Sequence, residues 1–140
     1  MLSTFLDFAK AFDKVHHGVL IKKLHKIGIT GKIFNWIKEF LYDRKQVIAV
    51  EGALSSESKV TSGVPQGSVL GPILFIIHIS DIDLRTNHTK VSSFADDTRI
   101  MKSVKEMNDR TLMQDDLASI YTWADENRMK FNAEKFEMLH

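Results

Sequence analysis

Two adjacent carboxylates, Asp96 and Asp97, lie between two short strand-like runs in the stretch from Val91 to Met101. Successive side chains of a regular strand point to opposite faces, so both carboxylates reach one partner only at a hairpin tip, where pairing ends. The stretch therefore predicts a strand, an acidic turn and a second strand. Paired carboxylates repel unless protons or cations neutralise them, and Mg²⁺ prefers oxygen ligands. The alternative is an ordinary solvated turn, because Asp is common in turns.

A third carboxylate, Asp7, lies in the apolar run from Thr4 to Phe8, which is typical of a buried strand that reaches the surface. A further unusual segment, from Ser62 to Pro72, contains three glycines and two prolines. Backbone without side chains can approach a ligand closely. The same segment is also compatible with a plain tight turn that leads into a helix, which the apolar run predicts from about Ser68 to Ser80.

The remaining chain supplies elements that could position these residues. Apolar residues at helical spacing predict helices over 19–27, over a segment capped by Thr30, and over 108–126. The second of these helices has one apolar stripe, formed by Ile33, Phe34, Ile37, Phe40 and Leu41. Strands are predicted at 46–50 and 58–61 around a polar loop at 52–57, and a short extended segment at 131–139 with a turn at 132–135.

The composition is that of one globular domain spanning residues 1–140, which buries roughly two-thirds of its unfolded surface. The sequence has no cysteine, which excludes disulfide frameworks and thiolate metal sites and favours a reducing compartment. The longest apolar run is interrupted, so it does not predict a membrane-spanning helix. The N-terminal apolar segment is too short for a signal peptide. We therefore expect an intracellular protein, in the nucleus or cytoplasm, with no membrane partner. Residues 1–60 carry ten Lys and Arg against six Asp and Glu, so phosphates are possible partners of this half.

Read in order, four motifs resemble those of reverse transcriptases from non-LTR (LINE-type) retrotransposons, with the greatest similarity to CR1/jockey-like elements. The motifs are LDFAKAFD at 6–13, SGVPQGSVLGP at 62–72, FADD at 94–97 and MKFNAEK at 129–135. Their order and spacing extend over nearly the whole chain. One departure is Phe94, where many relatives have tyrosine.

The resemblance implies that Asp7 and Asp96 are the two catalytic carboxylates, with Asp97 as a supporting member. In that role they bind two Mg²⁺ or Mn²⁺ ions, which activate the primer 3′-hydroxyl and hold the triphosphate. By the same resemblance, Lys135 protonates the leaving pyrophosphate or offsets its charge.

Further binding roles follow from the resemblance. Phe12 matches the aromatic gate that leaves no space for a ribose 2′-hydroxyl. Pro65, Gln66 and Gly67 match the loop over the nascent base pair, and Ser62 and Gly63 open that loop. The partners implied are an RNA template, a DNA primer and deoxynucleoside triphosphates.

The expected fold is an α+β polymerase palm. Its small antiparallel sheet carries Asp7 and the acidic hairpin, and the helices that start near Ser68 and Asn108 back one face. By comparison with the family, the fingers are largely missing and the thumb wholly missing, so the chain is expected to be a palm-centred fragment of an RNA-directed DNA polymerase. Two alternatives stay open: a catalytically silent remnant that at most binds nucleic acid, and a two-metal nuclease, which offers no reason for Phe12 or the PQG loop.

Overall fold

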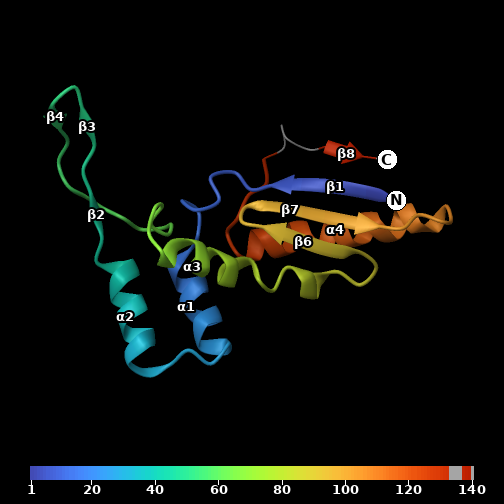
Figure 1. The fold of residues 1–140 in the computed structure, drawn as a ribbon, viewed down its shortest axis with the longest axis horizontal. Helices are drawn as coiled ribbons and strands as arrows, with labels where there is room; N and C mark the ends of the chain where they lie inside the picture. The colour runs from blue at the N-terminus through green and yellow to red at the C-terminus, as the bar shows by residue number, and fades with distance from the viewer. Residues whose placement is uncertain (133–136, 140) are drawn as a thin grey trace.

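Four antiparallel strands, in the order β6-β7-β1-β8, form the main sheet of the computed structural model (Figure 1). The structure describes residues 1–132 and the backbone of 137–139. The strands are β1 (Leu2–Asp7), β6 (Lys90–Phe94), β7 (Asp97–Lys102) and β8 (Glu137–Leu139). The central strand β1 pairs with β7 along its whole length, from Leu2 opposite Lys102 to Asp7 opposite Asp97. The two strands that carry the acidic motifs are therefore hydrogen-bonded neighbours.

Helix α4 (Asn108–Glu126) lies along one face of this sheet (Figure 1). Helix α3 (Leu70–Ile79) packs on the same side near the end of β1, where the ring of Phe8 contacts Phe75 of α3 and Trp123 of α4. Because side chains alternate along a strand, Leu6 and Ile100 point into this layer, where both are buried. They join a core that includes the fully buried Phe75 and Trp123. Burying each large apolar side chain is worth roughly 1.5–3 kcal/mol. The predicted α+β architecture, a small antiparallel sheet with helices packed on one side, is confirmed.

Helix α1 (His17–Lys26) lies beside α3 and is joined to it by a polar cluster. The Lys23 ammonium donates to the His78 carbonyl oxygen at 2.5 Å and to Asp81 Oδ1 at 2.8 Å. The Trp123 indole N–H donates to the same Asp81 oxygen at 2.9 Å, and Lys23 Nζ lies 5.1 Å from the centre of the Trp123 ring. This cluster connects α1, the end of α3 and α4.

The second helix, α2 (Gly31–Tyr42), follows Thr30 as predicted, although the Thr30 side chain makes no capping hydrogen bond. Its predicted apolar stripe is only partly correct. Ile37 and Leu41 are buried, but Ile33 is 67% exposed. Trp36 is also largely exposed and stacks on Phe40 at the rim of the core.

The segment between α2 and the Gly- and Pro-rich loop differs from the predicted pair of strands at 46–50 and 58–61. It forms two separate short ladders, β2 (Lys45–Gln46) with β5 (Ser58–Lys59) and β3 (Ala49–Val50) with β4 (Ala53–Leu54). Strand β4 thus lies inside the predicted polar loop. The hairpin projects away from the sheet (Figure 1), and every side chain from 45 to 59 is exposed. With no face to bury, alternation of side chains could not set a longer pairing register.

The other elements agree closely with the sequence. Helix α4 has the predicted bounds, α1 begins two residues earlier than predicted, and α3 begins two residues later. The polar connection before β6 contains a short 3₁₀ helix, η1 (Asp83–Arg85). Phe131 forms an isolated bridge with Phe8, whereas most of the predicted turn at 132–135 lies outside the described residues. None of the helices described is long and apolar enough to cross a membrane.

The loop between η1 and β6 is held by one buried carboxylate on α4. Asp116 accepts hydrogen bonds from the Asn87 and His88 backbone amides at 3.1 and 2.9 Å and from the Thr89 hydroxyl at 2.8 Å. Burial opposes the charge of Asp116, but these donors outweigh it and lower its pKa. Through this contact α4 determines where β6 enters the sheet.

Candidate active site

Asp7 and Asp97 lie directly opposite each other at one end of the sheet. Asp7 is the last residue of β1, Asp97 is the first residue of β7, and the pairing register makes them partners. Directly opposed residues in antiparallel strands point to the same face, with Cβ atoms about 4.5–5.5 Å apart. Asp7 is half-buried and Asp97 is exposed. Two carboxylates distant in sequence therefore meet on the sheet face opposite α3 and α4.

Asp96 lies outside the ladder, in the two-residue turn that it forms with Ala95. Ala95 has φ +53°, a left-handed conformation that tight hairpin turns require and that alanine seldom adopts. The sequence predicted both Asp96 and Asp97 in the turn, whereas Asp97 is a strand residue paired with Asp7 and with Phe94. The reason is that pairing with the remote strand β1 continues to its end, which the local sequence does not reveal.

The carboxylates fit a hard divalent cation by their chemistry, since all their donors are oxygen. Among the residues that the structure describes, no group of three or more His, Cys, Asp or Glu is arranged to hold a metal ion. Such an open arrangement is compatible with Mg²⁺, which proteins often bind through one or two carboxylates and substrate phosphates rather than through a closed cage.

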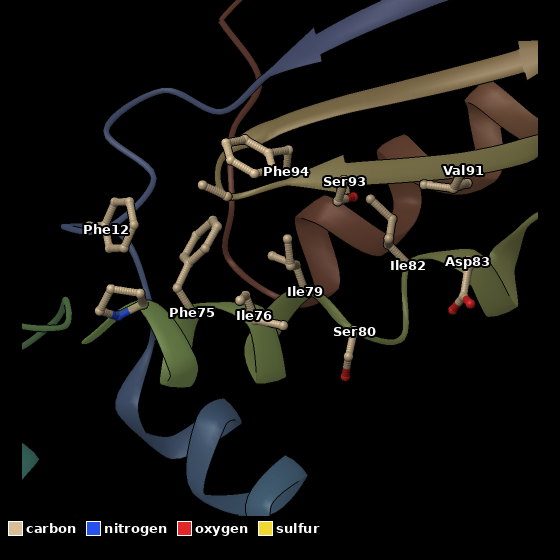
Figure 2. A pocket seen from close by; sticks show the side chains of 12 residues that line it. Phe12, Phe75, Ile76, Ile79, Ser80, Ile82, Asp83, Val91, Ser93 and Phe94 are labelled. Carbon is tan, nitrogen blue, oxygen red and sulfur yellow. The ribbon is translucent and has the colours of Figure 1, made fainter. Parts of the chain in front are cut away.

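Phe12 lies near the acidic hairpin and is oriented by a second aromatic ring. It stacks on Phe75 of α3, with ring centroids 4.7 Å apart and an angle of 29° between the rings. Phe75 is fully buried, whereas Phe12 is partly exposed. Figure 2 shows both rings at the edge of an apolar groove of about 480 Å³, which Phe94 of the hairpin also lines. The groove thus connects Phe12 with the acidic turn.

Ser62 and Gly63 are bound to the segment that carries Phe12. The Ser62 hydroxyl donates to the Asp13 carbonyl oxygen at 2.9 Å, and the Gly63 amide donates to the Val15 carbonyl oxygen at 2.8 Å. Gly63 has φ +90°, and a Cβ there would come within 3.0 Å of the Phe12 carbonyl oxygen. A glycine is therefore needed for this close approach. The first two motifs, about fifty residues apart in sequence, form one backbone unit.

The Gly63 carbonyl oxygen also accepts two side-chain hydrogen bonds that the sequence did not predict. His17 Nε2 lies 2.7 Å from it and the Arg44 guanidinium donates to it at 3.0 Å. His17 is a buried residue at the start of α1, and Arg44 lies next to β2. Nothing in the local sequence distinguishes His17 or Arg44 from neighbouring polar residues, because both partners are distant in the chain.

The PQG loop is held against the start of α3 by Ser68. Its hydroxyl donates to the Pro65 carbonyl oxygen at 2.7 Å and accepts from the Gly71 amide at 2.9 Å. A Cβ at Gly71 would overlap the Pro65 carbonyl oxygen, so this glycine permits the contact. Gln66 and Gly67 are exposed at the tip of the loop. Lys135, the last of the predicted site residues, lies outside the described residues.

The family model described as "Reverse transcriptase (RNA-dependent DNA polymerase)" matches residues 2–140. The chain is 34% identical to the RNA-directed DNA polymerase from the mobile element jockey of Drosophila melanogaster, over 96% of this chain and 15% of the relative. It is 28% identical to the probable RNA-directed DNA polymerase from transposon BS of the same organism, over 95% of this chain and 16% of the relative. The chain thus spans under a fifth of these relatives.

Among solved structures, the fold is similar to that of telomerase from Candida tropicalis. Apo telomerase truncated from its C-terminal domain superposes with a TM-score of 0.73 at 14% identity, covering 99% of this chain and 30% of that one. Telomerase with a fragment of telomeric RNA gives a TM-score of 0.74 at 13% identity, covering 99% and 26%. At these identities the likeness concerns the fold alone. With the family model matching almost every residue and a jockey polymerase 34% identical, the chain belongs to the reverse transcriptase family.

Proposed function

We propose that this chain is the palm of an RNA-directed DNA polymerase of a non-LTR retrotransposon, which transfers nucleotides onto a primer 3′-hydroxyl. The observation that carries the proposal is the opposition of Asp7 and Asp97 at the end of β1 and β7. The groove lined by Phe12 reaches Phe94 and Ala95 of the hairpin that joins β6 to β7. A two-metal nuclease would need the carboxylates alone. It would give no reason for the hydrogen bonds that join the Gly63 backbone to the Phe12 segment.

In this proposal the carboxylates of Asp7, Asp96 and Asp97 hold two Mg²⁺ or Mn²⁺ ions. When bound, the metals activate the attacking hydroxyl and stabilise the charge on the triphosphate. The protein's contribution is alignment, since positioning in phosphoryl transfer is equivalent to roughly 7–11 kcal/mol. Asp96 lies in a turn without a strand partner of its own, so its carboxylate can complete a site that the opposed pair begins.

The other residues orient the substrates. The ring of Phe12, supported by Phe75, lies under the deoxyribose and leaves no space for a 2′-hydroxyl. Gln66, at the exposed tip of its loop, offers amide hydrogen bonds near the incoming nucleotide and the template. Lys135 donates a proton to the pyrophosphate or offsets its charge. The corresponding partners are an RNA template, a DNA primer and deoxynucleoside triphosphates.

The test has two readouts. Mn²⁺ should broaden the NMR signals of residues around Asp7 and Asp96 in the wild-type chain, and a double Asp7→Asn, Asp96→Asn variant should lose this broadening. Asn preserves the shape and removes the charge. Equal broadening in both proteins would remove the metal assignment.

The second readout is addition of a single deoxynucleotide to an RNA-templated DNA primer, with an Asp96→Asn chain as the control for contamination. We expect slow, Mn²⁺-dependent addition that the control lacks. Processive extension is not expected, because the chain spans under a fifth of its relatives and has less protein to align the primer. Metal binding without any addition would favour the catalytically silent remnant.

A further inference from the structure

The carbonyl oxygen of Gly63, at the start of the PQG loop, is held by side chains from two different parts of the chain. His17, the first residue of α1, approaches it with Nε2 at 2.7 Å, and the guanidinium of Arg44, just after α2, donates to it at 3.0 Å. Because a carbonyl oxygen only accepts, Nε2 of His17 carries the proton of this bond. The oxygen has two lone pairs, so two donors use its whole accepting capacity. The orientation of this peptide group is thereby fixed.

The backbone of the same residue is fixed on its other side by the segment between Phe12 and His17. The Gly63 amide donates to the Val15 carbonyl oxygen at 2.8 Å, and the Val64 amide donates to the Phe12 carbonyl oxygen at 2.9 Å. Gly63 has φ +90°, a conformation that residues with a side chain rarely adopt. These two bonds and that of His17 come from one short segment. The segment that carries the Phe12 ring therefore also determines the direction in which the PQG loop leaves the core.

His17 itself is held in one orientation. Its side chain is 3% exposed, and its ring meets that of Tyr42, at the end of α2, edge to face with centroids 5.5 Å apart. The end of α2 thus supplies the ring that orients His17 and, two residues later, the second donor, Arg44. The Nε atom of Arg44 is buried and has no hydrogen-bond partner among the described residues. Since an unpaired buried donor costs stability, the arginine is better suited to orienting the carbonyl than to stabilising the fold.

The other end of the loop is fixed by Ser68, whose hydroxyl donates to the Pro65 carbonyl oxygen at 2.7 Å. Gln66 and Gly67 follow the two fixed carbonyls and are exposed. A Cβ at Gly67 would meet nothing within 4 Å. The loop therefore has a fixed base and an open tip, and the base sets the direction in which the tip presents Gln66.

We propose that His17 is a positioning residue: with Arg44, it orients the PQG loop through the Gly63 carbonyl. Gln66 is thereby held at a fixed place relative to the Phe12 ring, so that one incoming deoxynucleotide can contact both. This consequence rests on the proposed function. Loss of the His17 bond should weaken nucleotide binding without slowing the chemical step, which raises KM and leaves kcat nearly unchanged. A purely structural role would lower the folded fraction, and hence kcat, at constant KM.

The first experiment measures the loop by NMR in the 140-residue chain with EDTA. The ¹³C chemical shift of the Gly63 carbonyl reports the hydrogen bonds that it accepts. His17→Leu, which removes the donor and stays apolar, should move this signal upfield, and His17→Gln, whose amide can donate, should restore most of the shift. The control is His16→Leu, which removes the neighbouring imidazole and its bond to the Val19 amide at the start of α1. An unchanged signal in His17→Leu, or an equal change in the control, would overturn the proposal.

A further measurement uses the unaltered chain and therefore does not depend on whether a variant folds. The Nε2 proton of His17 is buried and hydrogen-bonded, so it should exchange slowly with water and give a resolved signal with a contact to the Gly63 backbone. A fast-exchanging proton would contradict the assignment.

The second experiment is single-deoxynucleotide addition with Mn²⁺. His17→Leu should raise KM for the matched nucleotide about tenfold, as expected for one lost hydrogen bond, with kcat changed by less than about threefold. His17→Gln should return KM to within about threefold of the wild type. A double His17→Leu, Arg44→Met variant should raise KM by more than the product of the single effects, because either donor alone still holds the carbonyl.

Two outcomes separate this proposal from the proposed function. Loss of kcat at constant KM in His17→Leu, without rescue by His17→Gln, would show a purely structural role and overturn the proposal. A wild-type chain that adds no nucleotide would count against the proposed function instead. The NMR experiment, which needs neither metal nor nucleotide, would still decide whether His17 positions the loop.

Discussion

Asp7 and Asp97 are cross-strand partners, although ninety residues separate them in sequence. Their register places the two acidic side chains next to each other on one face of the sheet. Such a pair is unfavourable when both groups are ionised and no cation is bound. The fold therefore carries a local electrostatic cost at the position that the metals are proposed to occupy.

From this opposition we predict that Asp97→Asn stabilises the metal-free chain. Removing one of two directly opposed like charges should raise the free energy of unfolding by roughly 0.2–1 kcal/mol. Urea unfolding in EDTA measures the change. Added Mn²⁺ should reverse the order, because the variant has lost a ligand and gains less from binding. A variant that is less stable than the wild type in EDTA would contradict the predicted repulsion.

A second prediction concerns sugar selection by Phe12. In a chain extended to the length of its relatives, Phe12→Ala should raise ribonucleotide use relative to deoxynucleotide use by roughly tenfold or more, because it removes a steric exclusion. Rates of single-nucleotide addition provide the ratio. Phe94→Ala is the matched control, since Phe94 is an aromatic residue of the hairpin that lines the same groove but is 85% exposed. It should affect both nucleotides alike. An unchanged ratio in the Phe12 variant would refute its assignment as the gate.

A third prediction tests the contact between the PQG loop and α3. Gly71→Ala should lower the free energy of unfolding by roughly 1–3 kcal/mol, because the added Cβ overlaps the Pro65 carbonyl oxygen and forces the backbone apart. Thermal or urea unfolding detects this loss. Gly18→Ala is the control, since its Cβ would meet only side-chain atoms of His16, at 3.1 Å or more, and no backbone atom. The control should change stability by less than about 0.5 kcal/mol. Equal effects of the two substitutions would argue against a close loop–helix contact.

A fourth prediction concerns acid stability and His78. Burial, with a smaller contribution from the Lys23 charge, lowers the pKa of His78 to about 3. The neighbouring Asp81 acts in the opposite direction. The unfolded chain therefore binds a proton at this residue below about pH 6.5, while the folded chain stays neutral until about pH 3. As the pH is lowered through this window, the free energy of unfolding should decrease by up to about 1.4 kcal/mol per pH unit.

The measurement is the free energy of unfolding at a series of pH values from neutral downward. His78→Leu, which keeps the volume and removes the titrating group, should show a shallower decline than the wild type. His88→Gln, at an exposed position, should follow the wild type. Identical pH dependence in the wild type and in the His78 variant would show that other groups cause the acid sensitivity.

Local periodicity in the sequence was enough to predict helix α4 with its bounds and helices α1 and α3 within two residues. It was also enough to predict the acidic hairpin, since apolar spacing and turn residues act over a few positions. The motifs indicated the family and an α+β palm. The projecting hairpin was predicted less well because it buries no face, so nothing in its pattern selects one pairing over another. Ile33 belongs to the predicted apolar stripe but is 67% exposed, because periodicity identifies the apolar face of a helix and does not show how much of that face other elements cover.

Long-range pairing and packing determined how the residues of the candidate site are arranged relative to one another. The register of β1 against β7 makes Asp97 the partner of Asp7 and leaves Asp96 in the turn, which two adjacent aspartates in a sequence cannot reveal. Tertiary packing also brought His17 and Arg44 to the Gly63 carbonyl oxygen, and Phe75 under Phe12. These contacts join segments from different parts of the chain. Their positions are determined by the shared core and the backbone hydrogen bonds, and no local pattern contains that information.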